Sequence, residues 1–186
     1  MANFQLAKEK ILKIEGGYVN RSADKGGETF RGISRNANPD WAGWKIVDAF
    51  RNLPNFPASL DKHLNLLQLV DLKYKADYWD SLKLDNIIYQ GVADEIFDIS
   101  VNMGIVTAAH LTQHALNLMN KNQKDYKDLT EDGKLGAITI MCINATKNFQ
   151  ALMKALNVLQ GARYAKICEA DPTQEEFFVG WIMNRC

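Results

Sequence analysis

Apolar residues recur at helical spacing from the start of the chain. Five of them step by three or four residues, as on the buried face of an amphipathic helix: Phe4, Ala7, Ile11, Ile14 and Tyr18. The doublet Gly16-Gly17 should end this helix, because glycine is favoured just past a helix C-terminus. We therefore predict an opening helix that ends beside Glu15.

Six later segments show the same periodicity. We predict helices over 59–79, where Ser59 would cap and Leu60, Leu64, Leu67, Tyr74 and Tyr78 would share a face, and over 91–104, 107–120, 135–145, 149–170 and 173–185. Prolines at positions 39, 54 and 57 mark a connecting segment that is expected to pack against the core, and no helix is predicted there. The polar residues 121–134 are expected to form a loop.

Residues 13–34 differ from this pattern because they hold five of the chain's 12 glycines and lack helical periodicity. The letters "DKGGET" are typical of a short hairpin, with a turn over "KGGE". Such a turn would place Asp24 and Thr29 opposite each other, about 5 Å apart. The expected fold class is α+β and predominantly α, with about seven helices and one small β-hairpin.

Composition and charge exclude several function classes. Lysine and arginine (22) balance aspartate and glutamate (22), so no basic face for nucleic acid is expected. No run of about 18 apolar residues exists, which argues against membrane insertion. The first 15 residues lack the apolar core of a secretory signal, so we expect synthesis in the cytoplasm without a signal peptide.

Glu15 is the strongest candidate for catalysis. A carboxylate in the last turn of a helix meets the negative end of the helix dipole, and partial burial also favours its protonated form. A raised pKa suits a general acid near neutral pH. With Asp24 and the hydroxyl of Thr29 on a facing hairpin, the set would suffice for glycoside hydrolysis. The alternative is a pair of surface carboxylates around an ordinary turn.

The motif residues closely resemble the start of the glycoside hydrolase family 108 lysozymes. The resemblance rests on Glu15-Gly16-Gly17-Tyr18, then Asp24-x-Gly26-Gly27-x-Thr29, then Gly32-Ile33-Ser34. It implies a lysozyme-like N-acetylmuramidase, a class also called secretion activators and found in phages and Gram-negative bacteria. The glutamate of this motif is the family's catalytic acid, which implies that role for Glu15. The spacing is also similar to the catalytic triplet of phage-type lysozymes, which implies Asp24 and Thr29 as partners, with Tyr18 at the substrate.

The second half of the chain is similar to the helical segment that accompanies these enzymes, named a predicted peptidoglycan-binding region. The resemblance implies an N-terminal catalytic part over 1–90 and a C-terminal helical part over 91–186, packed as one globular unit. Asp98 and Asn102 share a helix face and could bind a sugar or an acetamido group. A solvated face or a hydrogen bond to another helix is an equal alternative. His110 and His114 lack a third ligand, so no metal is expected. No cofactor is expected.

These observations lead to one expected function and one alternative. The expected function is hydrolysis of the β-1,4 bond between N-acetylmuramic acid and N-acetylglucosamine in peptidoglycan, by Glu15 with Asp24 and Thr29. The alternative is a non-catalytic peptidoglycan-binding or secretion-activating protein of the same fold. In either case the partner is the glycan strand of the cell wall or periplasm, reached through a holin-type export pore or by prophage lysis, as for a phage endolysin.

Overall fold

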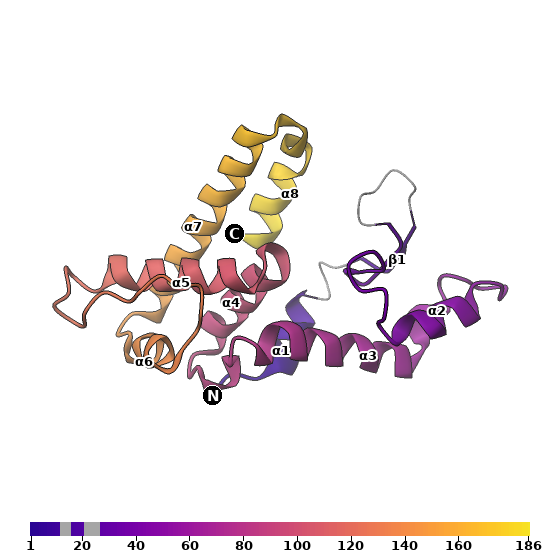
Figure 1. The fold of residues 1–186 in the computed structure, drawn as a ribbon, viewed down its shortest axis with the longest axis horizontal. Coiled ribbons are helices and arrows are strands. Elements are labelled where there is room, and N and C mark those ends of the chain that lie inside the picture. The colour runs from indigo at the N-terminus through magenta and orange to yellow at the C-terminus, as the bar shows by residue number, and fades with distance from the viewer. Residues whose placement is uncertain (12–15, 21–26) are drawn as a thin grey trace. The chain divides into compact units, whose positions relative to one another are not determined.

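Helices dominate the structure, a computed structural model that describes residues 1–11, 16–20 and 27–186. Eight α-helices lie within these residues (Figure 1): α1 (Phe4–Ile11), α2 (Gly43–Phe50), α3 (Leu64–Tyr74), α4 (Gln90–Met103), α5 (Ile105–Met119), α6 (Ala137–Ala145), α7 (Phe149–Ala170) and α8 (Glu175–Arg185). Four short turns of helix link them: η1 (Leu60–Lys62), η2 (Lys75–Asp80, a π-helix), η3 (Leu84–Asn86) and η4 (Pro172–Gln174). No described helix is long and apolar enough to cross a membrane.

The described strands form one small antiparallel sheet in the order β1 (Tyr18–Val19), β2 (Thr29–Phe30) and β3 (Ile33–Ser34). Its register pairs Thr29 with Val19 on one side and with Ser34 on the other. Thr29 thus lies on the central strand, between β1 and β3. Asp24 and part of the "KGGE" segment lie outside the described residues, so the expected turn and the placement of Asp24 opposite Thr29 stay predictions.

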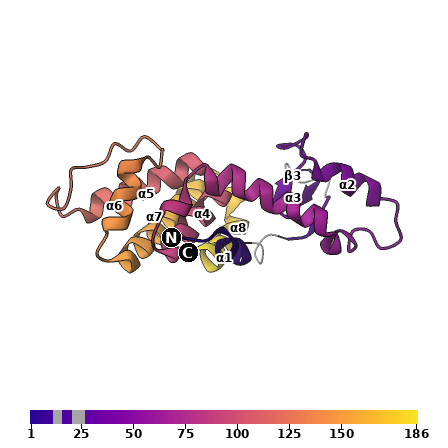
Figure 2. The same ribbon diagram turned by 90° about the horizontal axis from the view of Figure 1, so that it is seen from below.

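The chain divides into two compact units, one made of residues 8–77 and the other of residues 1–7 with 78–186. In the 8–77 unit, the sheet lies beside α2 and α3 (Figures 1 and 2). Its core is apolar and nearly free of solvent: Ile11, Phe30, Ile33, Trp44, Val47, Leu60, Leu66, Val70 and Tyr74. A unit of this size therefore has a hydrophobic core of its own.

The other unit is a helical bundle in which α4 packs against α5 and α7, and α7 packs against α8. Figure 1 shows α7 and α8 side by side, joined by the short turn η4. Phe4 belongs to this core, because its ring meets those of Trp79 and Phe97 edge-on, with centroids 5.7 and 5.8 Å away. Aromatic pairs prefer this edge-to-face geometry.

Most helices agree with the periodicity, and three details correct it. The predicted helix over 59–79 is broken, since α3 begins at Leu64, where His63 Nδ1 accepts a hydrogen bond of 3.2 Å from the Leu66 amide. Its buried face carries Leu66, Val70 and Tyr74, whereas Leu64 is exposed. On α5, Ala115 and Leu116 face the core, whereas Leu118 is exposed.

The third correction is α2, which lies in the segment expected to have no helix. Its helical face buries Trp44 and Val47. The nearby prolines hid this helix, because they flank it at positions 39, 54 and 57 without entering it. The two compact units meet between residues 7 and 8 and between residues 77 and 78. The expected division into a catalytic part over 1–90 and a helical part over 91–186 stays a prediction.

Candidate functional site

Two of the predicted site residues lie on adjacent strands of the small sheet. Tyr18 starts β1 and Thr29 starts β2, and both side chains are half-buried. The Thr29 hydroxyl donates to the Gly27 carbonyl oxygen over 3.3 Å. Glu15 and Asp24, the two predicted carboxylates, lie outside the described residues, so their roles stay predictions. The sheet nevertheless positions the residues that come next to them in the sequence.

A tight turn between β2 and β3 sets the shape of the sheet. Arg31 (φ 45°) and Gly32 (φ 77°) both have left-handed backbone, as in a two-residue type I′ hairpin. The Arg31 amide donates to the Gly17 carbonyl oxygen over 3.1 Å, and its own carbonyl accepts from the Tyr74 hydroxyl over 2.9 Å. The turn therefore connects helix α3 to the Gly16-Gly17 doublet, and this doublet directly follows Glu15 in the sequence.

Glu28 organises the polar side of the sheet. Its carboxylate accepts a hydrogen bond of 2.7 Å from the Tyr18 hydroxyl. It also forms ion pairs with Arg35 Nε (2.5 Å) and Arg51 Nη2 (2.7 Å), and the side chain is only 10% exposed. Ion pairs to a carboxylate that is shielded from water in this way are screened less by salt than surface pairs. The position of the Tyr18 hydroxyl is thus determined by a carboxylate that two arginines hold.

The two arginines connect the sheet to α2. Arg35 makes a bidentate contact with Asp48, with hydrogen bonds of 3.1 and 2.6 Å, and its guanidinium lies 4.4 Å from the ring centroid of Trp44. Arg51 Nη2 donates to the same Asp48 over 3.0 Å. Arginine suits this arrangement because its planar guanidinium can bind carboxylates in two-pronged fashion and stack on an indole.

Burial and these contacts shift the pKa values of Tyr18 and Asp48. Burial, followed by the hydrogen bond to Glu28, raises the pKa of Tyr18 above its ordinary value, so the hydroxyl remains a proton donor at neutral pH. Hydrogen bonds from Arg35 and Arg51 lower the pKa of Asp48. Tyr18 can therefore orient a polar group of a ligand, but it is a poor base.

Asp98 and Asn102, the other two predicted substrate contacts, lie in the helical unit and bind neighbouring helices. Asp98 Oδ1 accepts a hydrogen bond of 2.6 Å from Arg185 Nη1, and both side chains are at most 15% exposed. The Asn102 amide donates to the Tyr164 hydroxyl. The Tyr164 ring in turn stacks on Trp181 at 4.8 Å between centroids. The interhelical alternative thus describes their contacts, and the sugar-binding role stays a prediction.

A second polar cluster joins α5 to the loop over 121–134. His114 Nδ1 lies 2.9 Å and His110 Nδ1 3.4 Å from the Glu131 carboxylate, and Asn117 donates to it over 3.1 Å. Glu131 lies near both histidines. Among the described residues, however, no group of three or more His, Cys, Asp or Glu side chains is arranged so that it could hold a metal ion. We interpret this cluster as a structural tie of the loop.

The fold and these sites define a mostly helical α+β protein of the lysozyme-like class, with a small antiparallel sheet. The model of the family described as glycosyl hydrolase 108 matches residues 8–104, so the chain belongs to this family. A second model, described as a predicted peptidoglycan domain, matches residues 107–186. Together they assign the chain to the glycoside hydrolases that act on peptidoglycan.

A solved structure has the same fold. The structure of Brucella abortus SagA is similar to this chain with a TM-score of 0.66 and 22% sequence identity, over 98% of this chain and 88% of that one. No curated protein matches the chain. The likeness extends over both units, which supports the α+β class predicted from the sequence.

Sequence reasoning missed the group Glu28, Arg35, Asp48 and Arg51. The one available signal was a glutamate between Gly27 and Thr29, in a stretch where the other acidic residues were assigned to catalysis. Its partners lie 7 and 23 residues further on, so no local spacing links them.

Proposed function

We propose that the chain is an N-acetylmuramidase that hydrolyses the β-1,4 bond between N-acetylmuramic acid and N-acetylglucosamine in peptidoglycan. The observation that carries this proposal is the glycosyl hydrolase 108 match over residues 8–104, which includes Glu15 and the sheet that follows it. The match to the predicted peptidoglycan domain supports the same substrate.

Glu15 is the proposed general acid, which donates its proton to the oxygen of the leaving sugar as the glycosidic bond breaks. Asp24 stabilises the positive charge on the anomeric carbon or accepts a proton from the attacking water. The Thr29 hydroxyl positions that water, which adds to the anomeric carbon. Tyr18 supplies a neutral hydroxyl for a sugar substituent, which agrees with the raised pKa that burial and then Glu28 give it.

The proposed place of action is the cell wall, since the second family model is described as a predicted peptidoglycan domain. A phage endolysin that crosses the membrane through a holin-type pore, or a secretion activator that opens the wall locally, would both use this reaction. The proposal for the reaction does not depend on which of these roles the protein has.

The test is release of reducing ends from purified peptidoglycan by Glu15→Gln. Removing a general acid should lower the rate by about 100- to 10,000-fold. The matched control is Glu9→Gln, which makes the same change at an exposed position on α1 and should leave the rate unchanged. Equal thermal unfolding of both variants and the wild type would show that folding is intact.

Two results would contradict the proposal. If Glu15→Gln released reducing ends at the wild-type rate, another residue would be the acid. If the wild type bound insoluble peptidoglycan but released no reducing ends, the protein would be the non-catalytic, peptidoglycan-binding alternative.

A further inference from the structure

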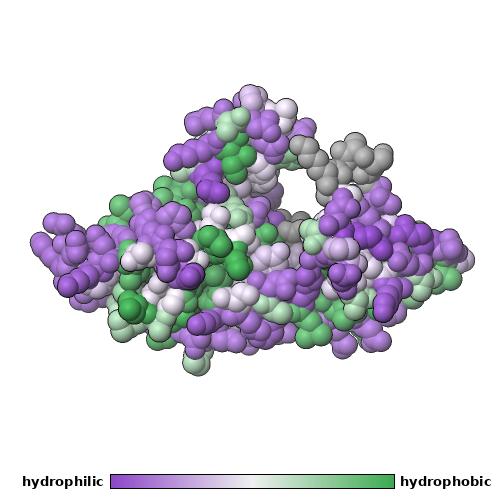
Figure 3. All heavy atoms as spheres, viewed as in Figure 1, coloured by the Kyte–Doolittle hydropathy of each residue, from purple (hydrophilic) through white to green (hydrophobic). Residues whose placement is uncertain are grey.

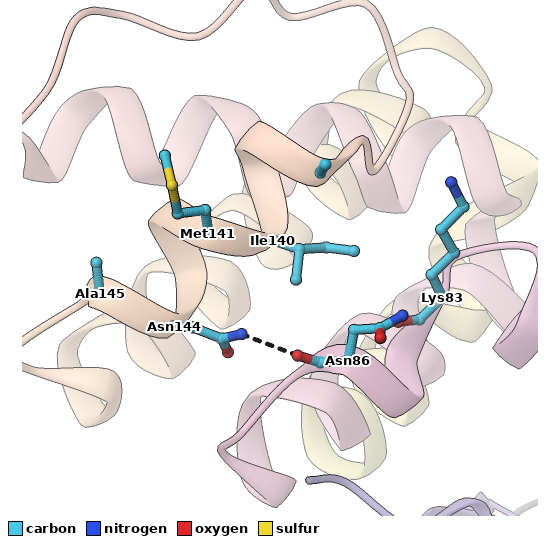
Figure 4. Close-up of a pocket in the computed structure, with 7 residues that line it drawn as sticks. Lys83, Asn86, Ile140, Met141, Asn144 and Ala145 are labelled. Carbon is cyan, nitrogen blue, oxygen red and sulfur yellow. Dashed lines mark hydrogen bonds between the residues drawn. The ribbon is translucent and has the colours of Figure 1, made fainter.

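The helical unit contains a pocket of its own between α6 and the segment around η3 (Figure 4). Its volume is about 710 Å³, within the range that small ligands occupy. Its lining includes Lys83, Asn86, Ile140, Met141, Asn144 and Ala145. Among the described residues, neither Thr29 nor the cluster around Glu28 lines this pocket.

Asn144 holds the two sides of the pocket together. Its amide nitrogen donates to the Asn86 carbonyl oxygen over 2.8 Å, as Figure 4 shows, and its amide oxygen accepts from the Ile88 amide over 2.9 Å. One side chain thus satisfies two backbone groups of the facing segment. The width of the pocket is therefore determined by hydrogen bonds and does not depend on a ligand.

The apolar part of the pocket comes from α6. Ile140 is nearly buried and forms part of the wall, while Met141 is 62% exposed. Hydrophobic residues also reach the surface around α6 in the space-filling view (Figure 3). A small apolar group of a ligand would be covered by Ile140 and Met141, which supplies the general driving force for binding.

The polar part of the pocket has a positive charge. Lys83 is exposed and has left-handed backbone (φ 54°), and among the described residues its ammonium group has no ion-pair partner. The described residues that line the pocket include no carboxylate. The side-chain nitrogen of Asn86 donates a hydrogen bond of 3.2 Å to the Lys83 carbonyl oxygen. The side-chain oxygen of Asn86 can therefore accept a hydrogen bond from a ligand. The pocket is complementary to a carboxylate beside a small apolar group.

We propose that this pocket binds the stem peptide of peptidoglycan, with a peptide carboxylate at Lys83 and an alanine methyl group against Ile140 and Met141. Stem peptides combine these two groups along a short chain, with amides that can donate to Asn86. The inference rests on the proposed function, and it adds recognition of the peptide to hydrolysis of the glycan. The α6 side of the pocket lies within the region matched by the predicted peptidoglycan domain.

The experiment titrates the full chain with a synthetic stem tetrapeptide, L-Ala-γ-D-Glu-meso-diaminopimelate-D-Ala, by calorimetry. We expect saturable binding that weakens as salt is added, because the Lys83 contact is exposed to solvent. Lys83→Ala should raise the Kd about 10-fold or more, since it removes a charge-assisted hydrogen bond. Ala145→Phe, at an exposed lining position, should abolish binding by filling the pocket.

The matched control is Lys121→Ala. Lys121 is also exposed, also has left-handed backbone (φ 56°), and lies outside this pocket, with an ion pair to Asp125 of 3.1 Å. The same backbone strain is therefore present in both variants, and only the Lys83 change should weaken binding.

Absence of saturable binding, or binding unchanged in both Lys83→Ala and Ala145→Phe, would overturn the inference. So would self-association of the chain that Ala145→Phe abolishes, because a second copy would then be the occupant. Release of reducing ends by the wild type is measured separately on glycan strands stripped of peptide. Hydrolysis without tetrapeptide binding would reject only the pocket, and tetrapeptide binding without hydrolysis would reject only the proposed reaction.

Discussion

The hydroxyl of Tyr18 donates a hydrogen bond of 2.7 Å to the carboxylate of Glu28, ten residues later in the chain. This bond links β1, which follows the predicted catalytic Glu15, to a carboxylate held by Arg35 and Arg51. The aromatic ring of Tyr18 is also fixed by edge-on contact with Phe56 at 4.8 Å between centroids. A residue predicted to contact substrate is therefore oriented by the protein itself.

Glu28→Gln should destabilise the 8–77 unit by about 1–3 kcal/mol, because it removes the charge between two arginines at a shielded position. Urea unfolding followed by tryptophan fluorescence measures the loss. Asp48→Asn is the matched control, since Asp48 pairs with the same arginines but is 49% exposed, and it should cost less than about 1 kcal/mol. Equal losses in the two variants would contradict the central role of Glu28.

Tyr18→Phe should cost about 1 kcal/mol of stability, because the ring contact with Phe56 remains and one hydrogen bond is lost. A double-mutant cycle with Glu28→Gln should give a clear coupling energy between the two positions. If Tyr18 also contacts substrate, Tyr18→Phe should raise KM for peptidoglycan more than Glu28→Gln does. An additive cycle would mean that the hydrogen bond contributes nothing.

The contribution of Glu131 to stability should be lost at acidic pH. Burial raises the pKa of this carboxyl, but hydrogen bonds from His114 and Asn117 outweigh it, and the net pKa lies below the ordinary value of 4.5. A lowered pKa means that the stabilisation is present above about pH 4.5 and is lost as the pH falls through the folded-state value. Glu131→Gln should be less stable than the wild type at pH 7 and lose less stability between about pH 5 and 3.

Thermal unfolding across this pH range measures that difference. Glu169→Gln, at an exposed position on α7, is the control and should follow the wild-type curve. A Glu131→Gln curve parallel to that of the wild type would show that the contacts with His110 and His114 do not affect stability.

Arg185→Ala should destabilise the helical unit by about 3 kcal/mol, because it removes the charged partner of the nearly buried Asp98. Near-ultraviolet circular dichroism of Trp181, which stacks on Tyr164, should report loosening of α8. Arg185→Lys keeps the charge and should restore part of the stability. Unchanged stability in Arg185→Ala would contradict the interhelical role.

Asn102→Ala separates the two interpretations of its side chain. As a donor to Tyr164, Asn102 should contribute about 1 kcal/mol to stability, and its loss should leave KM for peptidoglycan unchanged. A raised KM with unchanged stability would instead support the sugar-binding role predicted for Asp98 and Asn102.

Substitution of alanine for glycine should change stability in opposite directions at two positions. Gly27 has φ of 65°, and an added Cβ would lie 2.7 Å from Asn36 Nδ2, so Gly27→Ala should cost about 1–2 kcal/mol. Gly180 lies within α8, and an added Cβ would meet nothing within 4 Å, so Gly180→Ala should stabilise by about 0.5–1 kcal/mol. Chemical unfolding of both variants measures these changes in stability.

The sequence by itself determined where most helices lie and which family the chain belongs to. Helical periodicity depends on residues three or four positions apart, so Gln90–Met103 and Phe149–Ala170 could be recognised without knowledge of the fold. The motif that begins at Glu15 indicated the family in the same way, since its residues are close together in the chain.

Only the tertiary structure decided which partners the polar residues have. The register that pairs Thr29 with Val19, the ion pairs of Glu28, and the contact of Asp98 with Arg185 join residues between 7 and 87 positions apart. The same holds for the buried face of α3, where Leu66 and Val70 replace Leu64 because packing against the rest of the 8–77 unit selects the face. Local sequence patterns cannot predict these contacts, since burial and pairing depend on which segments meet when the chain folds.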